Sequence, residues 1–141
     1  MVTIKRFKRI GMHGDSFNIP YGTEVKEKGG VIFAPDGREI CLARSYAAHL
    51  HFARNDDGQG LIRGKLTHAI VDRLSPKYFK TKEERNEFWQ RIWNDETAQK
   101  YRRKDQETTW LWSDDFYNAP VEDLKYIAEL AEVKKGVVDD V

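Results

Sequence analysis

Residues 52–70, FARNDDGQGLIRGKLTHAI, bring carboxylates, an amide, glycines and a lysine together in one short segment that could bind a cation or a phosphate. An EF-hand calcium loop needs oxygen ligands at its positions 1 and 12 and a glycine at position 6. With Gly58 at position 6, position 1 is Ala53 and position 12 is Gly64, and neither has a side-chain oxygen. The sequence therefore argues against a calcium loop.

The same segment also fails as a P-loop, which has the pattern G-x-x-x-x-G-K-[ST] after a buried strand. Aligning Gly64 and Lys65 with the pattern puts Gln59 where the first glycine should be. Leu66 follows the lysine and lacks the hydroxyl that would bind magnesium. Nucleotide hydrolysis through this motif is therefore not expected.

The remaining interpretation of this segment is a corner between two helices. One helix is expected to end near Arg54, and the next to begin near Gly60 after a tight turn. Asp56 or Asp57 would then accept hydrogen bonds from free amides at the new N-terminus. Gly64 falls inside the second helix, where glycine costs about 1 kcal/mol relative to alanine. Close packing of another backbone, or of a partner, would explain it.

Histidines and one aspartate offer a possible metal site. On a helix His49 and His51 point to nearly opposite sides, whereas on a strand they share a face. His13 and Asp15, in a predicted loop, could join them. A metal-dependent nuclease using these residues stays open as an alternative, although no ligand spacing in the sequence specifies a metal.

Basic residues are concentrated near the start of the chain. Lys5, Arg6, Lys8 and Arg9 surround Phe7 and could contact phosphates or stack a base. The same run is also typical of the solvated face of an edge strand, where lysines discourage aggregation. One hypothesis that the sequence supports is nucleic-acid binding through these four cations, together with Arg54, Arg63 and Lys65.

Aromatic and acidic residues follow one another closely in WLWSDDFYN, residues 110–118. Trp side chains often anchor interfaces, and acidic residues can form the polar rim around them. We expect part of this segment to contact a partner protein, together with the charged residues of the 52–70 corner. The predicted partner-binding residues are Arg54, Asp56, Asp57, Arg63, Lys65, Trp110, Trp112, Asp114 and Asp115.

The elements that must position these residues indicate an α+β fold. Residues 1–43 are predicted to form an antiparallel meander of three or four strands, with 11–22 as a loop and glycine-containing turns at Gly29-Gly30 and Asp36-Gly37. Four or so helices are expected over residues 44–134. Residues 135–141 are expected to form a frayed tail. The predicted helix caps are Ser45, Thr81 in a T-x-x-E capping box, Asn94-Asp95 as an interruption or a new cap, and Asn118 before Pro120.

Composition sets the broad class. The 141 residues are 40% hydrophobic and 12% aromatic, which suits one domain with one core. No apolar run is long enough to span a bilayer, and the N-terminus lacks the apolar stretch of a secretory signal. The lone Cys41 is expected to be a buried structural thiol in a cytoplasmic protein, and neither a cofactor nor a catalytic set is predicted. Residues 1–80 have 14 Lys/Arg against 8 Asp/Glu, whereas 81–141 have 10 against 15.

Two segments carry a resemblance to known proteins: ARNDDGQGLIRGKL (53–66) and WLWSDDFYNAPVEDLKYIAEL (110–130). Together they resemble small accessory proteins from phages and mobile elements of Gram-positive bacteria, over roughly residues 10–130. These proteins have no assigned catalytic residues that could be transferred to this chain. The resemblance implies a protein that binds a host defence nuclease, most concretely an anti-CRISPR inhibitor of a Cas9-type, guide-RNA-bound effector in the host cytoplasm. A small nucleic-acid-binding regulator is the first alternative and a metal-dependent nuclease the second.

Overall fold

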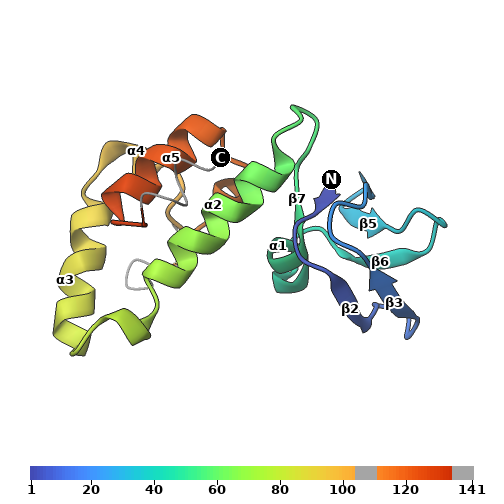
Figure 1. The fold of residues 1–141 in the computed structure, drawn as a ribbon, viewed down its shortest axis with the longest axis horizontal. Coiled ribbons are helices and arrows are strands. Elements are labelled where there is room, and N and C mark those ends of the chain that lie inside the picture. Colours follow the sequence, from blue (N-terminus) through green and yellow to red (C-terminus); the bar gives the residue numbers. More distant parts are fainter. Residues whose placement is uncertain (104–110, 135–141) are drawn as a thin grey trace. The chain divides into compact units, whose positions relative to one another are not determined.

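The computed structural model describes residues 1–103 and 111–134. By its internal contacts the chain divides into two compact units, Met1–Gly64 and Lys65–Val141. All seven strands of the described residues lie in the first unit, and most of the helices lie in the second (Figure 1). This order confirms the predicted α+β class, while the prediction of a single domain stays a prediction.

The first unit contains seven short strands in three antiparallel sheets. β1 pairs with β7, β2 with β3, and β4, β5 and β6 form a three-stranded meander. The bounds are β1 Val2–Thr3, β2 Phe7–Ile10, β3 Ser16–Ile19, β4 Lys26–Lys28, β5 Val31–Phe33, β6 Glu39–Leu42 and β7 Phe52–Ala53.

The predicted turn at Gly29-Gly30 joins β4 to β5. Gly29 and Gly30 have φ values of +59° and +79°, the backbone conformation that a two-residue hairpin turn needs at both positions. The turn fixes the register that places Ile32 opposite Glu27 and leaves Ile32 fully buried. The predicted meander over these strands is confirmed.

Further backbone hydrogen bonds connect strands of this unit to the loops beside other strands. The Thr3 amide donates to the Thr23 carbonyl at 2.9 Å, and the Met12 amide donates to the Ile40 carbonyl at 2.9 Å. The strands enclose a core whose buried members are Phe7, Phe17, Ile19, Val25, Ile32, Ala34, Ile40, Cys41, Ala48 and Phe52.

Helix α1 (Tyr46–His51) begins as predicted, because the Ser45 hydroxyl accepts a hydrogen bond from the Ala48 amide at 3.1 Å. It ends earlier than predicted. Residues Phe52 and Ala53 leave the helix to form β7, which pairs with β1. Both side chains are buried there, and this tertiary pairing overrides the helical pattern that continued toward Arg54.

The remaining helices begin with α2, which starts in the first unit and ends in the second. The Thr81 hydroxyl caps α3 by accepting from the Glu84 amide at 3.1 Å, and the Asp95 carboxylate caps α4. Both predicted caps are confirmed. The bounds are α2 Gly60–Arg73, η1 Pro76–Tyr78, α3 Lys82–Trp93, α4 Glu96–Gln99, η2 Asp114–Asn118 and α5 Val121–Leu130, where η1 and η2 are 3-10 helices.

Two local predictions were wrong. The segment 11–22, expected to be a loop, contains β3, in which Phe17 and Ile19 alternate with exposed residues and are buried. Asn118 does not cap the last helix, since it ends η2, and Pro120 occupies the position before α5. The predicted frayed tail lies outside the described residues. None of the helices in residues 1–103 and 111–134 has the length and apolar character needed to cross a bilayer.

Candidate nucleic-acid interface

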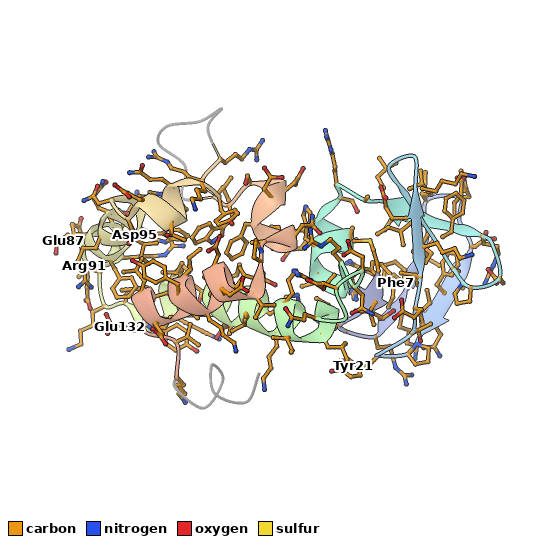
Figure 2. All side chains as sticks on the ribbon, turned by 90° about the horizontal axis from the view of Figure 1, so that it is seen from above. Phe7, Tyr21, Glu87, Arg91, Asp95 and Glu132 are labelled. Carbon is orange, nitrogen blue, oxygen red and sulfur yellow. The ribbon has the colours of Figure 1, made fainter. Side chains whose placement is uncertain are left out.

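The basic residues near the N-terminus are positioned by the β2–β3 hairpin. Phe7 pairs with Ile19 in the register and Arg9 pairs with Phe17. Phe7, which is labelled in Figure 2, is buried, as are Phe17 and Ile19. The Phe7 ring stacks on Phe52 with 5.5 Å between centroids. Three apolar anchors therefore fix this hairpin to the core of the first unit.

Gly11 allows the end of this hairpin to approach β6 closely. A Cβ atom at Gly11 would lie 2.4 Å from Phe17 Cε2 and 3.0 Å from the Ile40 carbonyl oxygen. Any larger residue would push the chain away from Phe17 and Ile40. The hairpin is therefore held in place at its turn as well as along its strands.

Hydrogen bonding and charge place the four cations on two sides of the hairpin. Arg6 Nη1 donates to Asn18 Oδ1 at 3.3 Å, and Asn18 lies opposite Lys8 in the register. Arg6 and Lys8 therefore share the outer face with Asn18. Lys5 and Arg9 lie toward His51 instead, and their charges help lower the pKa of that histidine. The basic run forms two pairs rather than one continuous patch.

These four cations are exposed, and none of them forms an ion pair with a carboxylate in the described part of the chain. Other exposed cations do form ion pairs. Arg38 Nε lies 2.8 Å from Asp36 Oδ2, and Lys77 Nζ lies 2.7 Å from Asp72 Oδ1. The positive charge of the hairpin is thus not neutralised by local carboxylates.

His51 is a structural residue next to this hairpin. It is 5% exposed, its Nδ1 lies 3.2 Å from the Lys5 carbonyl oxygen, and its ring packs edge-on against Phe7. Burial is the main cause that lowers the pKa of His51, so the imidazole is neutral at pH 7. It therefore fixes the backbone at Lys5 rather than adding charge to the surface.

The predicted metal ligands are not gathered into a site. His13 Nε2 lies 2.5 Å from Glu39 Oε2 in an exposed pair, while His51 is buried in the core. The described part of the chain contains no group of three or more His, Cys, Asp or Glu residues that could hold a metal ion. His13, Asp15, His49 and His51 therefore do not form such a group.

Cys41 is buried in the core of the first unit, in agreement with its predicted structural role. Burial raises the pKa of its thiol, although a hydrogen bond with Ser45 acts in the opposite direction. Because the thiolate is the nucleophilic form, this environment makes Cys41 unreactive at pH 7.

The turn predicted before α2 is present. Asn55 Oδ1 accepts from the Gly60 amide at 2.9 Å, and Asp57 Oδ1 accepts from the Gln59 amide at 3.0 Å. Asp56 is 74% exposed at its side chain and pairs with Arg54 Nε at 2.9 Å. The cap of α2 therefore comes from Asn55 and the turn from Asp57, so the segment that could have bound a ligand satisfies its own polar groups.

Arg63 stabilises this turn through hydrogen bonds to Arg54 and Asp57. Its side chain is fully buried, and its Nη1 donates to the Arg54 carbonyl at 2.7 Å. It also binds both carboxylate oxygens of Asp57, with Nη2 2.5 Å from Oδ2 and Nη1 3.3 Å from Oδ1. The Arg63 hydrogen bonds are the largest cause that lowers the pKa of Asp57 well below its usual range.

Trp112 lies in an aromatic cluster of the second unit. Its ring stacks on Phe116 at 4.2 Å and meets Trp93 edge-on at 4.6 Å, and Trp89 lies 5.9 Å away. Trp112 is 9% exposed. It is therefore part of the core of this unit.

The predicted partner-binding residues consequently separate into surface and core. Arg63 and Trp112 are buried and do not offer a contact surface. Trp110 lies outside the described residues. The members at the surface are Arg54, Asp56, Asp57, Lys65, Asp114 and Asp115.

Sequence reasoning missed Asn18, which orients Arg6. It lies in the segment interpreted as a loop, although the alternation of Phe17 and Ile19 with polar neighbours was a signal for a strand. The chain matches no protein-family model, no curated protein and no solved structure.

Proposed function

We propose that this protein is a small nucleic-acid-binding protein that contacts phosphates through the β2–β3 hairpin. The observation that carries the proposal is the set of four exposed cations, Lys5, Arg6, Lys8 and Arg9, without a described carboxylate partner. They are attached to a hairpin that Phe7 anchors in the core.

Phosphate binding by such cations is driven by the release of counterions from the nucleic acid, which makes affinity fall with salt. Because Arg6 and Lys8 share one face, a strand lying on that face would meet both of them. Ile10 is 62% exposed on β2, and Tyr21, two residues after β3, is 63% exposed. Tyr21 provides a ring on which a base can stack.

The test is a binding titration of labelled single-stranded and duplex oligonucleotides at low salt. We expect Arg6→Glu with Lys8→Glu to lower the affinity at least about tenfold, since both phosphate contacts become repulsive. The matched control is Lys82→Glu with Lys100→Glu, which makes the same charge change at exposed positions of the second unit. The proposal would be refuted if both double variants lost the same amount of affinity, or if the original protein did not bind the oligonucleotides.

A second candidate function is inhibition of a guide-RNA-bound defence nuclease of Cas9 type, as the resemblance to mobile-element proteins implies. Asp114 and Asp115 are exposed at the start of η2 and favour contact with a basic protein surface. This candidate expects the protein to block cleavage in a reconstituted assay and Asp114→Asn with Asp115→Asn to weaken the block. Unchanged cleavage at saturating protein would exclude it for the nuclease tested.

A further inference from the structure

A pocket of about 400 Å³ lies in the second unit. It is bounded by the last turns of α2, by η1 and by the turn that follows α5. Its charged and aromatic lining comes from Asp72, Arg73, Tyr78, Glu132 and Lys134. Pockets of this volume suit small organic ligands.

Arg73 has a guanidinium group that aromatic rings hold in place. Its Cζ lies 4.7 Å from the centre of the Phe88 ring, 5.4 Å from that of Phe79 and 5.5 Å from that of Tyr78. Its Nη1 is inaccessible to solvent and has no hydrogen-bond partner in the described part of the chain. A buried donor without an acceptor is costly, so an anionic ligand that draws the guanidinium toward the pocket and exposes Nη1 would give this donor an acceptor.

The charges around this pocket do not cancel. Asp72 is engaged by Lys77 at 2.7 Å and by the Tyr78 hydroxyl at 2.9 Å, and these bonds lower its pKa. Glu132 Oε2 lies 3.7 Å from Arg91 Nη2 (Figure 2).

By contrast, Arg73 and Lys134 form no ion pair with a described carboxylate. Two positive charges therefore remain on the pocket wall.

The wall also includes a strained residue. After α5 the Glu132 amide donates to the Glu129 carbonyl at 3.0 Å and the Val133 amide donates to the Ala128 carbonyl at 2.9 Å, which is the Schellman pattern. The turn puts Glu132 at φ +57°, a conformation that usually selects glycine. Strained backbone of this kind clusters at ligand sites.

We propose that this pocket binds a small organic anion with a ring. Its phosphate or carboxylate group would accept from Arg73 and Lys134, because the guanidinium fork matches both head groups, and its ring would pack on Tyr78. This site is separate from the hairpin proposed to contact nucleic acid, and it would take a free small molecule rather than a polymer.

The test is an NMR titration of the full chain with phenyl phosphate, benzoate and uncharged benzyl alcohol. We expect saturable shifts of the amides near Arg73 and Lys134 with the two anions, and none with the alcohol. The tighter of the two anions identifies the preferred head group.

The variants Lys134→Met and Arg73→Lys should each weaken anion binding at least about fivefold. Lys134→Met removes a positive charge, and Arg73→Lys removes the paired N–H donors of the guanidinium group. Lys82→Met, at an exposed position outside the pocket, should leave it unchanged. The amide spectrum of each variant reports whether it is folded. The proposal would be overturned if neither anion produced saturable shifts. It would also be overturned if all three variants bound the anions with equal affinity.

Discussion

The Ile4 side chain fills the space beside Gly64, in the middle of α2. A Cβ atom at Gly64 would lie 2.5 Å from Ile4 Cγ2 and 2.6 Å from Ile4 Cδ1. Both residues belong to the first unit. The glycine is therefore explained by a neighbouring side chain from the N-terminal segment, and neither a second backbone nor a partner protein is needed.

Gly64→Ala is expected to destabilise the fold by about 1–2 kcal/mol, because the steric cost against Ile4 exceeds the helix propensity gained by alanine. Chemical denaturation measures the free energy of unfolding. Adding Ile4→Ala should make the Gly64→Ala change harmless or stabilising. Lys65→Ala, at an exposed position of the same helix, is the control and should change little. A stabilised Gly64→Ala single variant would contradict the packing described.

Asp57→Ala is expected to cost about 2 kcal/mol at pH 7, because it leaves the fully buried Arg63 without its carboxylate. Asp57 itself is partly exposed, and solvent screening keeps the loss below that of a fully buried pair. Denaturation curves at several pH values provide the measurement.

The pH dependence follows from the lowered pKa of Asp57. A carboxyl group with a lowered pKa stabilises the folded state above its unfolded pKa, near 3.8, and this stabilisation is lost as pH falls toward the folded pKa. The difference between the original protein and Asp57→Ala should therefore shrink below about pH 4. The control is Asp56→Ala, which removes an exposed ion pair. If Asp56→Ala lowers the free energy of unfolding as much as Asp57→Ala does, the loss of the Arg63 partner does not explain the effect of Asp57→Ala.

Local sequence signals predicted the elements that depend on local chemistry. Ser45, Thr81 and Asp95 cap helices, and Gly29-Gly30 forms a hairpin turn, because each acts on amides or dihedrals within a few residues. The strand β7 was missed since its pairing with β1 joins residues about fifty positions apart. Long-range pairing of this kind leaves no mark in a local pattern.

Glu132→Gly is expected to stabilise the second unit by about 0.5–1 kcal/mol, because glycine adopts the positive φ of this position without strain. The exposed ion pair with Arg91 is lost in this variant and contributes little. Thermal unfolding provides the measurement. Glu129→Gly, inside α5, is the matched control and should destabilise by about 1 kcal/mol. Destabilisation by both changes would show that Glu132 is not strained.

Trp112→Ala is expected to cost about 3–5 kcal/mol, because the indole fills space among Trp89, Trp93 and Phe116. Leu111→Ala changes the neighbouring residue, which is 42% exposed, and should cost much less. Near-ultraviolet circular dichroism and denaturation follow both variants. A stable Trp112→Ala protein would mean that this ring belongs to a surface.

The candidate site was less predictable than the fold. The sequence identified Lys5, Arg6, Lys8 and Arg9 as a basic run, but their division between two sides follows from Asn18 and His51, which are distant in sequence. The predicted partner surface combined residues by charge and type alone. Burial of Arg63 and Trp112 depends on tertiary packing, and composition does not specify it.

The slope of the logarithm of the nucleic-acid association constant against the logarithm of salt concentration tests the central proposal most directly. Two phosphate contacts from Arg6 and Lys8 contribute about −2 to this slope on duplex DNA. In Arg6→Gln with Lys8→Gln the slope should become less steep by about 2, while Lys82→Gln with Lys100→Gln should keep the original slope. A slope that is unchanged in the hairpin variant would contradict the proposal that the β2–β3 hairpin binds nucleic acid.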